Sequence, residues 1–313
     1  MKQAYIIIAH NKFEQLKFLI SLLDYKEHDI FIIVDSKVNV EESTITSLKS
    51  GAIHSNVILV DRVPIYWGSY SQIFAEMLGF RYAYNYDNYS MFHLLSGVDL
   101  PLVPADKLFK FFDHNKSNNF LSMVSDEILK SNKVYERVQF RYLFPRFLTR
   151  NIQNKYVRKF VAYYRKLEIK IQRLLNMDCF KKYNMRLGYA SNWLSINKDL
   201  VRIILEEEKN IEKIFKYSIV NDELFIPTIM YKYNLMESLY SSSPITDTPD
   251  DFQGNLRYIN WWDGDPHTWT DSEHDIEQLK RGKALGHKFS RKFDLERYPN
   301  LKEEILTIIN GTD

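Results

Sequence analysis

Residues 4–9 read Ala-Tyr-Ile-Ile-Ile-Ala, an unbroken apolar run that ends at His10 and Asn11. Such a short run is typical of a parallel strand that is buried on both faces of a sheet. Residues 12–23 follow it with apolar side chains at helical spacing, namely Phe13, Leu16, Leu19, Ile20 and Leu23. A buried strand that leads directly into an amphipathic helix predicts an α/β fold.

The same alternation continues over the first hundred residues. Residues 29–35, 55–61 and 89–97 have the pattern of buried strands, and residues 71–85 have that of a helix, with Ser69 as a candidate cap. This order predicts a doubly wound, mostly parallel sheet flanked by helices. The predicted strands end at polar residues: His10, Asp35, Asp61, Ser96 and Asp99. Because ligands bind beside the carboxyl ends of such strands, we expect a binding site at this edge.

The composition limits the class of protein. A chain of 313 residues can bury a large core, and the absence of a linker predicts a single domain over residues 1–313 with a mixed helical C-terminal half. The formal net charge of +2 argues against a nucleic-acid partner. The only cysteine, Cys179, excludes an internal disulfide. The apolar stretches are too short for a signal peptide or a membrane span, so we expect a cytoplasmic protein.

The C-terminal half is predicted to contain a strand over residues 189–196, helices over 198–209, 221–233 and 301–310, and a loop over 241–255. Before it, residues 130–186 carry sixteen basic side chains against three acids. Residues 156–175 within this segment have helical periodicity with a basic face. Such a helix suits an anionic membrane surface or a phosphorylated partner, but a solvated helix facing acids elsewhere has the same pattern.

Two acidic pairs are candidates for chemistry. Asp222 and Glu223 follow Asn221, a good helix cap, so we expect them in the first helical turn, where the helix dipole favours ionised carboxylates. A general base must begin ionised, although most such pairs only stabilise a helix start. Asp263 and Asp265 could hold a divalent metal, or they could form a turn before Pro266.

Seven motifs in order carry a family resemblance. They are "IAHNKFEQLKFLISLL" from residue 8, "IIVDSK" from 32, "WGSYSQIFAEMLGFRYA" from 67, "LLSGVDLPL" from 94, "GYASNWLSI" from 188, "NDELFIPTIM" from 221 and "FSRKFD" from 289. Over residues 4–296 the chain resembles glycosyltransferase family 14, which includes the core-2 and I-branching β-1,6-N-acetylglucosaminyltransferases and protein O-xylosyltransferases. It is similar to a bacterial, unanchored member.

The resemblance implies a GT-A type fold and an inverting transfer from a UDP-sugar, with N-acetylglucosamine as the default sugar. It implies that no metal or other cofactor is required. Residues 1–125 would be the nucleotide-binding half, and residues 126–313 the acceptor and catalytic half. The family's general base falls on Glu223, and its diphosphate-binding lysine on Lys292, with Arg291 beside it. The family's second phosphate-binding arginine has no clear match, and either Arg291 or Arg257 could replace it.

The resemblance also implies contacts on both sides of the reaction. On the donor side it places Asp35 at the uridine and His10, Ser96, Gly97 and Asp99 nearby. On the acceptor side it points to Trp67, Glu136, Arg137, Arg141, Asp222 and Trp261. The expected partners are a UDP-sugar and a glycan or lipid-linked glycan of cell-surface polysaccharide synthesis, with peripheral contact at the inner membrane. The alternatives are a metal-dependent transferase using Asp263 and Asp265, and a noncatalytic carbohydrate-binding relative.

Overall fold

The computed structural model of the chain describes residues 1–148, 152–264 and 266–311. Its central sheet has the strand order β3-β2-β1-β4-β6. The strands are β1 (Lys2–Ala9), β2 (His28–Val34), β3 (Asn56–Leu59), β4 (Tyr89–Ser96) and β6 (Ser195–Asn197). The first four are parallel, and β6 lies antiparallel beside β4. The parallel strands place their carboxyl ends at a common edge, as the sequence predicts.

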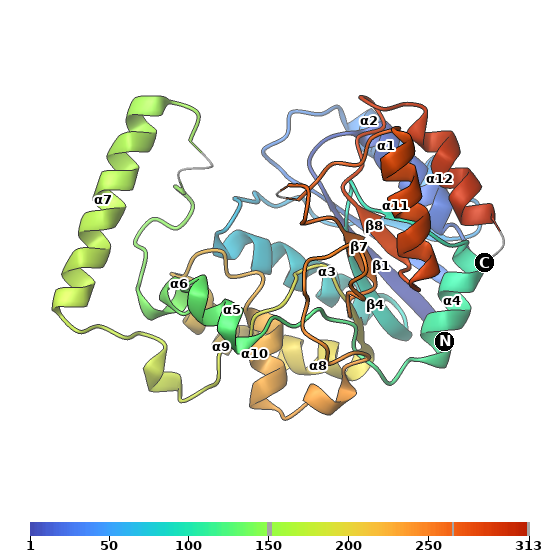
Figure 1. Ribbon diagram of the computed structural model, residues 1–313. Coiled ribbons are helices and arrows are strands. Elements are labelled where there is room, and N and C mark those ends of the chain that lie inside the picture. Colours follow the sequence, from blue (N-terminus) through green and yellow to red (C-terminus); the bar gives the residue numbers. More distant parts are fainter. Residues whose placement is uncertain (149–151, 265, 312–313) are drawn as a thin grey trace.

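Helices cover both faces of this sheet (Figure 1). Ala4 and Ile6 of β1 point into a core that is shared with α3 (Tyr70–Tyr86), α8 (Lys198–Glu206) and α10 (Phe225–Lys232). Tyr5 and Ile7 point to the opposite core, which contains α1 (Phe13–Leu23), α4 (Ala105–His114), α11 (Glu273–Ala284) and α12 (Leu301–Asn310). Burial on both faces explains why the strands are continuously apolar. The predicted α/β class, a mostly parallel sheet flanked by helices, is confirmed.

A smaller sheet joins the C-terminal part of the chain to the N-terminal part. Its order is β5 (Leu100–Pro101), β8 (Phe289–Arg291) and β7 (Arg257–Ile259). The buried side chain of Gln15 on α1 fixes this arrangement. Its amide nitrogen donates to the carbonyls of Gly97 (3.3 Å) and Phe293 (3.2 Å), and its oxygen accepts from the backbone N–H of Leu295 (2.9 Å).

The remaining elements connect these layers. They are α2 (Glu42–Ser47), η1 (Leu48–Gly51), α5 (Asp126–Ser131), α6 (Glu136–Gln139), α7 (Lys155–Leu174), η3 (Lys181–Tyr183), α9 (Glu208–Phe215) and η4 (Met236–Ser238). Helix α7 confirms the helix predicted in the basic segment and stands at one side of the molecule, away from the central sheet (Figure 1). No helix among the described residues is long and apolar enough to cross a membrane.

Three local predictions need correction. The strand predicted over residues 189–196 is short and occupies only β6. The helix predicted over 198–209 is broken near Glu207 into α8 and α9. The helix predicted from Asn221 begins instead at Phe225, so Asn221 is not its cap. The fully buried amide of Asn221 donates to the carbonyl of Phe215 (2.8 Å) and closes a turn, which leaves Asp222 and Glu223 outside the helix.

Candidate active site

The donor edge of the sheet gathers several of the predicted residues. Asp35, at the end of β2, is buried, and its Oδ1 accepts from the backbone N–H groups of Lys37 (3.0 Å) and Ile65 (3.2 Å). His10 follows β1 at the same edge. Partial burial lowers the pKa of His10; the charge of Asp35 opposes this shift, and those of Lys37 and Lys292 add to it. Asp35 and Lys292 therefore both lie within electrostatic reach of His10.

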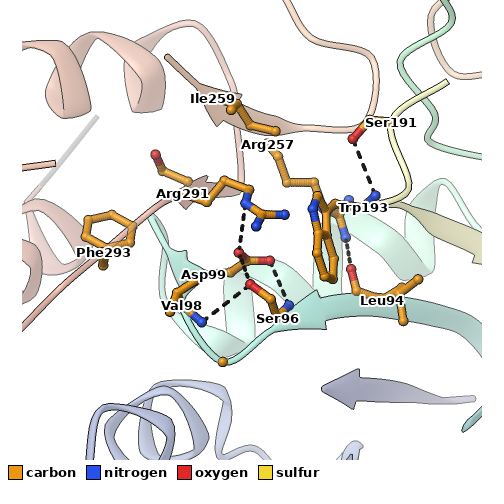
Figure 2. Close-up of polar contacts among 12 residues, drawn as sticks. Leu94, Ser96, Val98, Asp99, Ser191, Trp193, Arg257, Ile259, Arg291 and Phe293 are labelled. Atoms are coloured by element: carbon orange, nitrogen blue, oxygen red, sulfur yellow. Dashed lines mark hydrogen bonds and ion pairs between the residues drawn. The ribbon is translucent and has the colours of Figure 1, made fainter. Parts of the chain in front are cut away.

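Arg291, which precedes Lys292 in the sequence, is buried (Figure 2). Asp99, which is fully buried, accepts from the backbone N–H (3.0 Å) and hydroxyl (2.7 Å) of Ser96. Its Oδ1 lies 3.4 Å from Nε of Arg291, whose guanidinium lies 4.2 Å from the ring centre of Trp193. Burial lowers the pKa of Arg291, and the charge of Asp99 opposes that shift. Ser96 and Asp99 thus fix the position of Arg291.

The contacts of Gly97 and Arg257 are made within the fold. The N–H of Gly97 donates to the carbonyl of Ile8 (3.0 Å), and a Cβ at this position would lie 3.1 Å from Cβ of Ala9. The glycine permits the turn after β4 to approach β1. The guanidinium of Arg257 is fully buried and donates to Leu194 O (2.7 Å) and Ser195 Oγ (3.0 Å). Figure 2 shows its longer hydrogen bond to Leu94 O (3.4 Å). Because these groups occupy it, the expectation that Arg257 could bind phosphate is wrong.

Asp222 and Glu223 have different environments. Asp222 is buried, and its Oδ2 accepts from the amides of Asn192 (2.9 Å) and Gln72 (3.1 Å). Burial and the charge of Glu223 raise the pKa of Asp222 to about 7. Glu223 keeps 28% of its side chain exposed, and its Oε2 lies 2.8 Å from Nη1 of Arg137. Burial raises the pKa of Glu223, whereas the charge of Arg137 opposes this shift.

Turn geometry places these two acids. Val220 has a left-handed backbone (φ 46°), its N–H donates to the carbonyl of Gly68 (2.7 Å), and its carbonyl accepts from Arg137 Nη1 (3.3 Å). Gly68 itself has φ 70°, and a Cβ there would lie 2.5 Å from Cδ1 of Leu148. A glycine is therefore required where the loop before α3 meets the turn that carries Asp222.

Contacts connect the donor edge to this acidic turn. Ile65 bonds Asp35 and belongs to the same loop as Gly68, which bonds Val220. On the other side, Trp193 stacks on Arg291, and the neighbouring Asn192 bonds Asp222. One set of contacts thus runs from Asp35 to the acidic turn, and a second runs from Arg291, the neighbour of Lys292 in the sequence, to Asp222.

The remaining predicted acceptor residues are placed as follows. Trp67 and Trp261 are 41% and 39% exposed. Arg141 is exposed, with its guanidinium 5.4 Å from the ring centre of Tyr217, and Glu136 accepts from Arg173 at 2.9 Å through both carboxylate oxygens. These side chains come from both halves of the chain, and Arg137 is the one for which the structure describes a bond to Glu223.

The structure describes one member of the predicted metal pair. Asp263 accepts at Oδ2 from the amide of Asn260 (2.9 Å), and its own N–H donates to Asn260 Oδ1 (3.0 Å), which is turn geometry. Asp265 lies outside the described residues. Within residues 1–148, 152–264 and 266–311, no group of three or more His, Cys, Asp or Glu side chains is placed to hold a metal ion.

One acidic residue near Asp222 was not predicted from the sequence. Glu76 lies on α3, is 2% exposed, and has an Oε2 atom without a hydrogen-bond partner. Burial and the nearby charge of Asp222 raise its pKa well above the ordinary value. A signal was present, because Glu76 shares the buried helical stripe of Ile73, Met77 and Phe80. A carboxyl on an apolar helix face is rarely without a role.

Three solved structures show low overall similarity to the chain. TarS from S. aureus has TM-score 0.27 and 11% identity over 40% of this chain and 21% of its own. Core-mannan synthase A from Aspergillus fumigatus, in an Mn/GDP form, has TM-score 0.33 and 12% identity over 72% and 70%. Apo-form GlyE from Streptococcus pneumoniae TIGR4 has TM-score 0.26 and 10% identity over 44% and 37%. The chain thus spans about a fifth of TarS and over a third of GlyE, and these TM-scores do not establish a shared fold.

One sequence family matches most of the chain. No curated protein sequence matches the chain. The family described as "Core-2/I-Branching enzyme" matches residues 3–283, which include the strands of both sheets up to β7, the acidic turn and α3. The chain therefore belongs to the Core-2/I-Branching enzyme family, whose members are glycosyltransferases.

Proposed function

We propose that the chain transfers a sugar from a UDP-sugar to a glycan acceptor with inversion, using Glu223 as the general base. In this step the acceptor hydroxyl gives its proton to Glu223 while its oxygen attacks the anomeric carbon. The bond from that carbon to the diphosphate oxygen breaks, and UDP leaves with the electron pair. The observation that carries the proposal is the ion pair of 2.8 Å between Arg137 and the partly exposed Glu223.

Glu223 suits this role better than its neighbour. Asp222 is buried, and its Oδ2 is held by two amides. Arg137 binds only Oε2 of Glu223, and no described residue donates to Oε1. We propose that Oε1 accepts the proton of the acceptor hydroxyl, while Arg137 keeps the carboxylate in one orientation. We assign Asp222 to the positioning of the turn and of the acceptor.

The donor side supplies positive charge for the departing diphosphate. Lys292, Lys37 and Arg291 lie at the edge where Asp35 would meet uridine. Fixed cations stabilise charge that develops on a leaving group, which is the work that a metal ion performs in other transferases. We therefore propose that the transfer proceeds without a bound metal ion.

A matched pair of variants tests the base. Glu223→Gln should keep UDP binding in calorimetry and lose about 10²–10⁴-fold in transfer, because general base catalysis has this magnitude. Glu303→Gln changes an exposed glutamate on α12 and should leave both unchanged. Full turnover by Glu223→Gln would refute the assignment. A wild-type protein that ignores UDP would instead support the noncatalytic carbohydrate-binding alternative.

Assay of the wild type in excess chelator separates the two enzymatic alternatives. Retained transfer supports charge stabilisation by the protein alone. If the chelator abolishes transfer and added Mn²⁺ restores it, the metal-dependent mechanism through Asp263 and Asp265 is favoured.

The family resemblance supports N-acetylglucosamine as the donor sugar and a cell-surface polysaccharide intermediate as acceptor. A thermal-shift series of UDP-sugars tests the donor, because the preferred ligand should raise the melting temperature most.

A further inference from the structure

Helix α7 packs against the protein through its polar face. Gln172 bonds both the N–H (2.9 Å) and the carbonyl (2.7 Å) of Arg141. Glu168 accepts from the N–H of Leu143 (2.8 Å), and Arg165 donates to the carbonyl of Phe144 (3.2 Å). A helix on a globular protein ordinarily turns its apolar stripe toward the core. In α7 this orientation is reversed.

The opposite face of α7 presents a continuous apolar stripe to solvent. It consists of Tyr156, Phe160, Tyr163, Leu167, Ile171 and Leu174. At 3.6 residues per turn these positions fall within an arc of about 80°. Each side chain is between 45% and 74% exposed. Large apolar side chains gathered in this way mark a surface that meets another apolar phase.

Further exposed apolar side chains flank the helix. The ring of Tyr164 lies 6.4 Å from that of Phe144, which lies 6.4 Å from that of Phe147. Phe144, Phe147 and Leu143 are all exposed. Because residues 143 and 144 also bond the inward face of α7, these side chains flank the helix, and we call the apolar stripe alone the α7 face.

The exposed charged residues of α7 are all positively charged. The exposed charged residues of the helix are Lys155, Arg158, Lys159, Lys166, Lys170 and Arg173. The single acid of the helix, Glu168, is buried against residues 141–144. Apolar side chains flanked by basic ones are the pattern of helices that lie in the headgroup region of anionic membranes.

We propose that the α7 face docks on a lipid bilayer that contains anionic lipids. The stripe would enter the boundary of the acyl chains, and the lysines beside it would reach the lipid phosphates. A second copy of the chain is a poorer occupant, because it would bring one basic helix against another with no exposed acid on either to pair with.

The position of the α7 face adds a geometric consequence. Leu143, Phe144, Pro145 and Arg146 also line an open pocket of about 390 Å³, together with Tyr66 and residues 69–71 at the start of α3. That loop contains Gly68, which bonds the turn of Asp222 and Glu223. Because Leu143 and Phe144 bond the inward face of α7, a docked α7 face would place the helix between this pocket and the bilayer, with the pocket within one loop of the acidic turn.

Co-flotation of the full chain with vesicles tests the proposal. We expect binding at low salt to vesicles that contain phosphatidylglycerol, with weaker binding to pure phosphatidylcholine. Phe160→Ser with Leu167→Ser should weaken partitioning about tenfold or more for each side chain. Lys159→Gln, Lys166→Gln and Lys170→Gln together should weaken binding to the anionic vesicles about 100-fold.

Two control variants separate docking through the α7 face from nonspecific hydrophobic or electrostatic adsorption to the vesicles. Ile53→Ser removes an exposed apolar side chain far from α7 in the sequence, and Lys49→Gln with Lys209→Gln and Lys280→Gln removes three exposed lysines elsewhere. Both should bind like the wild type, and circular dichroism should show every variant folded. Failure of the wild type to float at low salt overturns the proposal. Light scattering that shows a dimer, dissociated by the Ser variants without vesicle binding, overturns it in favour of a second copy.

Discussion

Nη1 of Arg137 lies 2.8 Å from Oε2 of Glu223 and 3.3 Å from the carbonyl oxygen of Val220. One cation thus holds both the carboxylate and the backbone of the turn that carries it. It also opposes the effect of burial on the pKa of Glu223. The position and the protonation of the proposed base therefore depend on the same side chain.

Arg137→Gln should move the acidic limb of the pH–rate profile to higher pH. A base works only when deprotonated, so kcat/KM falls as the pH drops below its pKa. Removing the charge of Arg137 leaves burial unopposed and raises the pKa of Glu223 further. Profiles of kcat/KM for the wild type, Arg137→Gln and Arg141→Gln would check this. Arg141 has no contact with Glu223, and an equal displacement in both variants would contradict the mechanism.

Lys292→Ala should weaken the binding of UDP itself by about tenfold to hundredfold, the effect of losing a hydrogen bond to a charged group. Calorimetric titration with UDP measures the change directly, without requiring an acceptor. Lys280→Ala removes an exposed lysine on α11 and should bind UDP normally. Unaltered affinity in Lys292→Ala would place the diphosphate elsewhere.

Glu76→Gln should stabilise the protein increasingly as the pH rises. The folded state raises the pKa of Glu76, so the folded protein keeps a proton that the unfolded chain releases above about pH 4.3. Wild-type stability from this group is therefore present at low pH and is lost as the pH rises, by at most about 1.4 kcal/mol per pH unit. Urea unfolding at acidic and alkaline pH would show a widening difference. A constant difference, like that of an exposed control such as Glu303→Gln, would contradict the prediction.

Gly68→Ala should destabilise the protein by about 1–3 kcal/mol, because alanine resists a positive φ. The new Cβ would also meet Leu148, so the loop and the acidic turn should shift and transfer should fall. Adding Leu148→Ala relieves the steric contact but not the dihedral strain, and the double variant should recover only part of the loss. Thermal unfolding and activity of both variants test this, and a Gly68→Ala protein equal to wild type would show that the close approach is unimportant.

The central sheet could be predicted from the sequence because strands that are buried on both faces are apolar at every position. The run at residues 4–9 is apolar at every position, since alternate side chains enter two different cores. The positions of His10 and Asp35 followed from the same reasoning, because parallel strands end at one edge.

The acidic turn was harder to predict. Asparagine is a common helix cap, but the side-chain amide of Asn221 donates instead to the carbonyl of Phe215. No local sequence pattern predicts this contact. Arg257 and Arg291 were equivalent as sequence candidates and differ only in burial partners. For α7, periodicity predicted two faces but could not say that the polar one would point inward.

Gln15 bonds Phe293, which lies 278 residues further along the chain. During translation, α1 and β1 leave the ribosome long before the carbonyl and amide groups that satisfy this glutamine exist. The nascent chain can pair β1 with β2 early, but the surface of α1 around Gln15 stays open until the last strand segments have been synthesised. A shortened polypeptide would thus leave the polar groups of Gln15 without these partners, on a part of α1 that the full-length protein buries.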